Sequence, residues 1–130
     1  MNADRRKLAQ VFAAAKASFR YASDLTAYHA SEHWAGPEEI RQQIADQGFV
    51  LGDCDDFASL CVYLGRKVGL PMRFVLCLTE AGESHLVAEV DGWIMDNRQY
   101  QVERRDDLGY TWVAISGLVE GAAWHAIKQE

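Results

Sequence analysis

Residues 53–71 read DCDDFASLCVYLGRKVGLP and predict one helix with a clear beginning and end. Asp53 is a favourable N-cap residue, and the two aspartates that follow Cys54 suit the positive end of a helix dipole. Gly69 is a natural residue just past a helix end, and Pro71 prevents continuation. The apolar side of this helix is formed by Phe57, Ala58, Cys61 and Leu64. We therefore expect the helix to pack one face on a core.

Downstream of this helix the hydrophobic pattern changes to that of β-strands. Four runs fit strands, namely residues 72–78, 85–90, 93–96 and 110–116. Asp91-Gly92 separates the middle two runs, and an Asp-Gly pair in that setting is a strong signal for a hairpin. Helices followed by antiparallel strands predict an α+β domain in which the cysteine-bearing helix packs on the sheet.

Upstream, the sequence predicts two further helices. The first has the apolar spacing of an amphipathic helix at Leu8, Val11, Phe12, Ala15 and Phe19. Basic residues 5–7 before an apolar run also resemble a secretory signal, but Gln10 interrupts that run and the helical spacing favours a packed helix. The second helix should begin at Pro37, which two glutamates follow, and end near Gly48.

Length and composition limit the classes of protein to which the chain can belong. A chain of 130 residues with 49% apolar and 25% charged residues fits one soluble domain spanning residues 1–130. The net charge of -6 argues against nucleic-acid partners and anionic membrane surfaces. No stretch approaches the ~18 to 20 apolar residues of a membrane span. Three cysteines cannot all pair within one chain, which favours a reducing, cytoplasmic location.

The hairpin places a histidine and an aspartate on one face of the sheet. A two-residue turn sets Val90 opposite Trp93, so His85 and Asp96 become diagonal neighbours, roughly 7 to 8 Å apart at the backbone. Their face also carries Val87, Glu89, Ile94 and Arg98, whereas the opposite face is apolar and carries Leu86, Ala88, Val90, Trp93 and Met95. An aspartate bonded to one imidazole nitrogen fixes the tautomer and leaves the other nitrogen free to act as a base.

Cys54 is the candidate nucleophile. Unpaired N–H groups and the dipole at a helix N-terminus favour a thiolate, which predicts a lowered pKa for Cys54, and the same N–H groups can donate to an oxyanion. Cys61, on the apolar face of the helix, and Cys77, inside a strand, have no such reason to react. Spacing alone leaves the structural alternatives open: a small buried cysteine at Cys54, a surface histidine at His85 and a strand-end cap at Asp96.

Three motifs connect the chain with a known family: Gly52-Asp53-Cys54-Asp55-Asp56-Phe57-Ala58, Ser84-His85-Leu86-Val87 and Trp93-Ile94-Met95-Asp96-Asn97. With the upstream segment Trp34-Ala35-Gly36-Pro37-Glu38-Glu39, they resemble the bacterial transglutaminase-like cysteine proteinases, a branch of the papain-like transglutaminase superfamily. The resemblance spans roughly residues 19–97 and keeps the order Cys, His, Asp. It implies a papain-like core in a bacterial or phage protein.

The resemblance also implies roles for individual residues. Cys54 would be the nucleophile, His85 the general base and acid, and Asp96 the orienting carboxylate. A second oxyanion donor could come from the indole of Trp34, as in some transglutaminases, or from the amide of Gln47, near where papain-like enzymes keep a glutamine. The structural alternatives are a core aromatic for Trp34 and a solvated helix end for Gln47.

The acids around Cys54 raise the question of a metal. Some members of the family bind calcium near the cysteine helix, and Asp53, Asp55 and Asp56 lie there. Helix capping and the dipole also explain these acids without a metal, and no complete cage of 6 to 8 oxygens is visible in the sequence. Zinc is disfavoured because no paired cysteine or histidine spacing occurs. We therefore expect no resident metal or cofactor.

These observations predict a cysteine-dependent peptidase or amidase that acts on a protein or peptide through a thioester intermediate. Water as the acceptor gives hydrolysis, and an amine gives acyl transfer of the transglutaminase type. A catalytically inactive domain that binds a peptide or protein in the same cleft is the main alternative, because fold alone does not establish activity.

Overall fold

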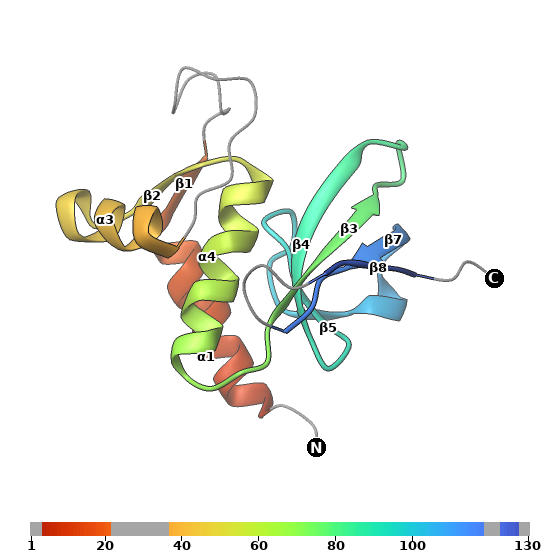
Figure 1. Ribbon diagram of the computed structural model, residues 1–130, viewed down its shortest axis with the longest axis horizontal. Helices are drawn as coiled ribbons and strands as arrows, with labels where there is room; N and C mark the ends of the chain where they lie inside the picture. Colours follow the sequence, from red (N-terminus) through yellow and green to blue (C-terminus); the bar gives the residue numbers. More distant parts are fainter. Residues whose placement is uncertain (1–3, 22–36, 119–122, 128–130) are drawn as a thin grey trace.

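The computed structural model describes residues 4–21, 37–118 and 123–127 and places helices before the main sheet (Figure 1). In chain order the first part contains α1 (Arg5–Ala17), β1 (Phe19–Tyr21), α3 (Pro37–Gln47), β2 (Val50–Gly52) and α4 (Cys54–Lys67). The second part contains β3 (Arg73–Leu78), β4 (Ser84–Val90), β5 (Trp93–Met95), β6 (Glu103–Arg104), the 3-10 turn η1 (Arg105–Asp107), β7 (Thr111–Ile115) and β8 (His125–Ala126). The predicted α+β class is confirmed.

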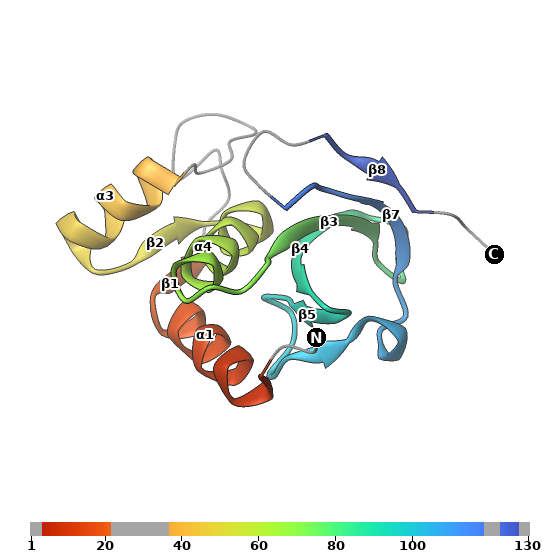
Figure 2. The same cartoon turned by 60° about the horizontal axis from the view of Figure 1, so that its bottom comes forward.

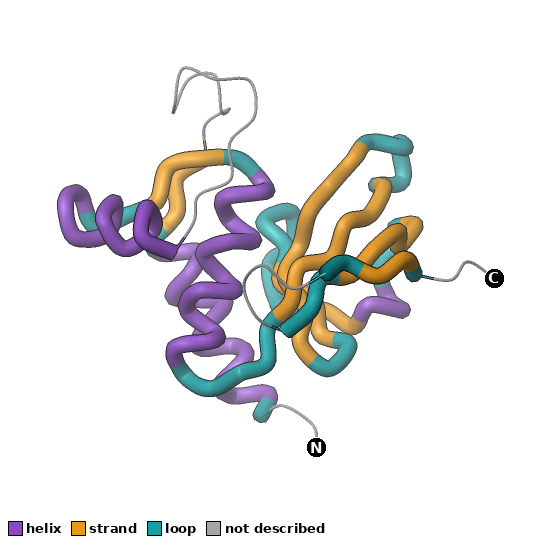
Figure 3. Tube along the Cα trace, viewed as in Figure 1, coloured by secondary structure: helices purple, strands orange, loops and turns teal. Residues whose placement is uncertain are grey.

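The main sheet has six strands in the order β6-β5-β4-β3-β7-β8, and all neighbouring pairs are antiparallel. Figure 2 shows that the sheet curves, with α4 lying beside β3 and β4 and α1 lying beside α4. The predicted helices and hairpin are all present. Figure 3 shows the small parallel pair β1–β2 among the helices, and the sequence did not predict this pair.

The boundaries of α4 follow from local chemistry, as predicted. Asp53 caps the helix, and its carboxylate accepts a hydrogen bond from a first-turn N–H while Asp56 bonds back to the N-cap. At the other end, Gly69 has a positive φ of 85°, and the N–H of Leu70 donates to the carbonyl of Gly65 at 2.9 Å. A left-handed glycine with this bond is a common way to end a helix.

The hairpin register is also confirmed. Val90 pairs with Trp93, and the turn residues Asp91 and Gly92 have φ of 52° and 84°, as a type I′ turn requires. The two faces join different clusters. The face with Ala88, Val90 and Met95 packs with α1 and α4, whereas the other face contributes to a cluster of Val75, Cys77, Val87, Ile94 and Tyr110. The hairpin thus separates the helical core from the side that carries His85 and Asp96.

Aromatic contacts join α1 to α4. The ring of Phe57 in α4 meets Phe12 edge-on with centroids 6.0 Å apart and Phe19 with centroids 5.1 Å apart. Burying a side chain such as Phe57, which is 1% exposed, contributes about 2 to 3 kcal/mol. In the described part of the chain, no helix is long and apolar enough to cross a membrane.

Candidate functional site

The first turn of α4 holds Cys54 in place through hydrogen bonds of its neighbours. Asp53 Oδ1 accepts from the N–H of Asp55 at 3.1 Å, and Asp56 Oδ2 accepts from the N–H of Asp53 at 3.1 Å. Asp56 is fully buried. Because these bonds bracket Cys54 on both sides, the backbone that carries the thiol has little freedom.

Gly52 is required by this arrangement. A Cβ at Gly52 would lie 2.1 Å from Asp56 Oδ2, so Gly52→Ala must displace the buried carboxylate that caps α4. We expect the variant to lose roughly 1 to 3 kcal/mol of unfolding free energy, measured by urea denaturation. Gly109→Ala is the control, because a Cβ there meets nothing closer than 3.6 Å. Equal stability of the two variants would contradict the steric argument.

His85 and Asp96 are brought together as the hairpin register predicted. His85 Nε2 lies 2.7 Å from Asp96 Oδ1, and the two residues are only 6% and 1% exposed. His85 is in β4, and Asp96 follows the last residue of β5. The surface-histidine alternative for His85 is therefore wrong, because the ring is buried and paired.

A tyrosine that the sequence did not single out completes the environment of Asp96. Tyr110 Oη donates to Asp96 Oδ2 at 2.5 Å, and the N–H of Arg98 donates to Oδ1 at 3.0 Å. The Tyr110 ring also meets the His85 ring edge-on, with centroids 5.7 Å apart. Burial alone would raise the pKa of Asp96, but the hydrogen bond and charge of His85, with the bonds from Tyr110 and Arg98, hold it below its ordinary value. Asp96 therefore stays ionised.

The thiol of Cys54 lies beside β4. It is close enough to the backbone N–H of Leu86, the residue after His85, for that N–H to favour the thiolate. The S–H donates to Asp55 Oδ1 at 3.6 Å. Burial, together with the carboxylates of Asp55 and Asp53, raises the pKa of Cys54 to about 12. The predicted lowering of this pKa by the helix N-terminus is wrong, because desolvation and two adjacent negative charges outweigh the favourable N–H groups.

The other two cysteines are less accessible. Cys61 and Cys77 are fully buried, and burial raises the pKa of both thiols. The thiol of Cys77 donates to the carbonyl of His85 at 3.4 Å. Cys54, which is half-buried, is therefore the most accessible of the three cysteines.

Of the two oxyanion candidates, only Gln47 belongs to the described part of the chain. Trp34 lies outside the described residues. Gln47 is exposed at the end of α3, where its amide donates to Phe49 O at 3.0 Å and to Gln43 Oε1 at 3.3 Å. The extended strand β2 separates Gln47 from the start of α4. This placement matches the solvated helix end that was the alternative for Gln47.

Carboxylates at the start of α4 could hold a cation. Ligand atoms of Asp53, Cys54 and Asp55 all lie within 4.8 Å of one another. Asp56 differs from these residues, because its carboxylate is buried and caps the helix. Two carboxylates with backbone oxygens and water suit a hard divalent cation, whereas a sulfur ligand does not.

Comparisons with known proteins agree on one fold. A family model described as the transglutaminase-like superfamily matches residues 2–125. Three structures of Legionella pneumophila LapG resemble the chain. One has a TM-score of 0.70 at 18% identity and covers 93% of this chain and 67% of LapG. The EGTA-treated form has a TM-score of 0.72 at 19% identity, and the match covers 95% of this chain and 67% of LapG. The calcium-bound form has a TM-score of 0.71 at 20% identity, and the match covers 95% of this chain and 69% of LapG. No curated protein matches the chain.

Proposed function

Because the chain belongs to the transglutaminase-like superfamily, we propose that it is a cysteine-dependent hydrolase that cleaves an amide bond in a peptide or protein. The observation that carries the proposal is the buried hydrogen bond between His85 and Asp96, next to the strand segment that contacts Cys54. In this proposal Cys54 is the nucleophile, His85 the base and Asp96 the orienting carboxylate, which are the three roles of an activated-nucleophile site.

In the proposed reaction, Cys54, His85 and Asp96 each have a defined role. His85 binds Asp96 through Nε2, so Nδ1 is the nitrogen left to accept the thiol proton. As that proton moves to His85, the sulfur of Cys54 attacks the amide carbon, and Asp96 stabilises the imidazolium that forms. The amine leaves with the proton, and a thioester remains on Cys54. Water, deprotonated by His85, attacks the thioester, which releases the acid and restores the thiol.

The raised pKa of Cys54 affects the first step of the proposed reaction, the attack of the sulfur on the amide. A thiol with a pKa of about 12 is protonated at neutral pH, so the reactive thiolate forms only as His85 takes the proton. The S–H must also turn from Asp55 toward His85. Arrival of an amide substrate beside the sulfur is the event that would favour this turn.

A peptide library tests the proposal. Wild-type protein and Cys54→Ser are incubated with the library, and new termini are identified by mass spectrometry. Cleavage by the wild type alone supports hydrolysis, and products joined to an added amine would indicate acyl transfer. Binding of peptides without any cleavage or transfer would overturn the proposal in favour of an inactive binding domain.

Tyr110 is expected to act as a positioning residue for this chemistry. Tyr110→Phe removes the hydrogen bond to Asp96 Oδ2 but keeps the ring against His85. We expect kcat to fall about 10- to 150-fold with little change in KM, since one charge-assisted bond contributes about 1.5 to 3 kcal/mol. That bond lowers the pKa of Asp96, so the acidic limb of the pH profile should move to higher pH.

Tyr63→Phe is the control for this change, because Tyr63 packs in the helical core and its ring lies under Lys67. If Tyr110→Phe loses only stability and keeps the wild-type kcat and pH profile, Tyr110 is structural.

A calcium site at the start of α4 is a second proposal, supported by the carboxylates of Asp53 and Asp55 that lie close together. The LapG structures in calcium-bound and EGTA-treated forms agree with it. A divalent cation there would neutralise the two carboxylates that face Cys54. We expect calcium at 100 times its Kd to add about 2.7 kcal/mol of stability, read as a rise in Tm.

The calcium effect should disappear in Asp55→Asn. Glu38→Gln, on the exposed side of α3, removes a carboxylate elsewhere and should leave the effect intact. An equal response of both variants to calcium would exclude this site.

A further inference from the structure

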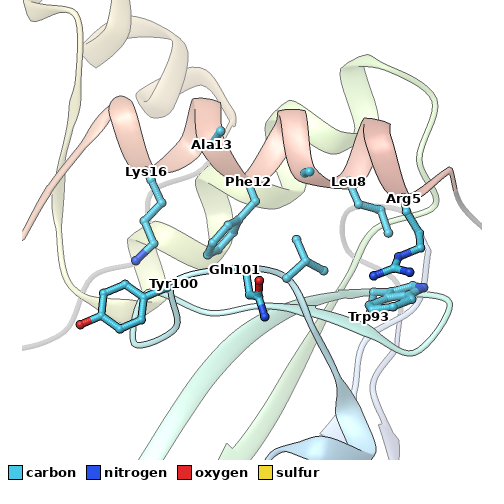
Figure 4. Close-up of a pocket in the computed structure, with 10 residues that line it drawn as sticks. Arg5, Leu8, Phe12, Ala13, Lys16, Trp93, Tyr100 and Gln101 are labelled. Carbon is cyan, nitrogen blue, oxygen red and sulfur yellow. The ribbon is translucent and has the colours of Figure 1, made fainter.

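A groove of about 350 Å³ runs along α1, on the side that faces β5 and the segment after it (Figure 4). Its floor is apolar: Ala9, Ala13 and Val102 supply the accessible apolar surface, whereas Leu8 and Phe12, which also line the groove, are only 1% and 4% exposed. Arg5 and Trp93 form one end, whereas Lys16 and Tyr100 lie at the other. The side chain of Tyr100 is fully exposed. None of the residues of the proposed catalytic site lines this groove.

Both ends of the groove are positively charged. Arg5 and Arg104 lie over the ring of Trp93 at 5.0 and 4.9 Å from its centroid. Lys16 Nζ donates to the carbonyl of Asn97 at 2.9 Å and keeps further N–H groups to donate. No acidic residue of the described chain lines the groove, although the protein has a net charge of -6. The groove is thus a positive strip on an acidic protein.

The length and the lining of the groove indicate which kind of ligand it would bind. Arg5 and Lys16 are eleven residues apart on one helix, which corresponds to about 16 Å. An extended peptide rises about 3.3 Å per residue, so the first and fifth Cα atoms lie about 13 Å apart, and the side chains of these two residues, which point to the same face, reach the remaining distance. The apolar floor between the cations fits an apolar central side chain. A nucleotide fits less well, because two guanidinium groups already cover the Trp93 ring on which a base would stack.

We propose that this groove binds an extended segment of a partner protein with acidic residues at both ends and apolar residues between them. The acidic end groups pair with Arg5 and Lys16, and a central side chain packs against Ala9, Ala13 and Val102. Lys16 also donates a hydrogen bond to the carbonyl of Asn97, the residue after Asp96. The Lys16 end of the groove therefore borders the chain segment that carries the proposed catalytic carboxylate, while binding itself requires no catalytic residue.

Nuclear magnetic resonance titration tests the proposal with blocked peptides of sequence Glu-Leu-Leu-Leu-Glu and, as a matched control, Lys-Leu-Leu-Leu-Lys. The protein is the full chain carrying Cys54→Ala, so cleavage cannot interfere. We expect the acidic peptide to shift signals of α1, Trp93 and residues 100–102, and to bind at least tenfold more tightly than the basic one. Added salt should weaken binding, because both contacts are charge pairs.

Charge-removing variants separate this site from general attraction. Arg5→Gln combined with Lys16→Gln should weaken binding at least tenfold, whereas Arg41→Gln, on exposed α3, should leave it unchanged. The proposal is overturned if the acidic peptide causes no shifts at about 1 mM, the weak end of specific binding. Equal affinity for the basic peptide, or wild-type affinity in the double variant, would overturn it as well.

Discussion

Replacing Cys54 by serine is expected to lower kcat/KM by a factor on the order of 10⁴ to 10⁶ for any peptide that the wild type cleaves. Serine keeps the size of the side chain but is a far weaker nucleophile when its only base is poised for a thiol. Removal of the nucleophile in a comparable triad costs about 2 × 10⁶ in kcat. The loss should appear in kcat, with substrate binding retained, and initial cleavage rates measure it.

Cys61→Ala is the matched control, because it removes a second thiol from the same helix. Cys61 is fully buried seven residues after Cys54, so its loss should reduce stability and not the chemical step. A Cys54→Ser variant with wild-type activity would show that another residue is the nucleophile, and the proposed function would fail with it.

Changing Asp96 to asparagine is expected to lower kcat by about 10⁴-fold. The amide has nearly the shape of the carboxylate, but it can donate a hydrogen bond to His85 Nε2 and so stabilise the wrong tautomer. The equivalent change in a serine protease triad costs a factor of about 10⁴ for this reason. Single-turnover kinetics would locate the loss in the formation of the thioester.

Glu89→Gln offers a closely matched control. Glu89 is also a buried carboxylate, 3% exposed, on the face that the register assigns to His85 and Asp96. Burial raises its pKa, and its nearest ion-pair partner is Arg73 at 3.5 Å. We expect this variant to keep activity within about threefold, as an interaction outside the chemical step should. Similar losses in Glu89→Gln and Asp96→Asn would point to general destabilisation.

Local signals in the sequence were enough to predict α4 and the β4–β5 hairpin. The caps of α4 depend on residues within one or two turns of the helix, and the Asp-Gly turn determines the pairing of its own flanking strands. The pairing of His85 with Asp96 followed from that register, because both residues belong to the same hairpin. These parts of the site needed no knowledge of distant contacts.

Other parts depend on long-range packing and could not be read from the chain. Tyr110 reaches Asp96 because β7 lies beside β3, and no local pattern specifies that neighbour. The parallel pair β1–β2 joins three residues on each side across an interval of the chain that contains α3. The pKa of Cys54 is raised, and not lowered as expected, because Cys54 is buried against β4. That burial is a contact between distant parts of the chain.

The two-residue turn at Asp91 and Gly92 makes the length of the chain between β4 and β5 a requirement of the proposed catalytic site. Adding one residue there would shift β5 by one position, and Asp96 would then point into the helical core, away from His85. The loop between β3 and β4 has no such coupling, because β7 holds β3 on its other side. Relatives that keep the chemistry can therefore differ in length between Leu78 and Ser84, but insertions between Val90 and Trp93 should disable them.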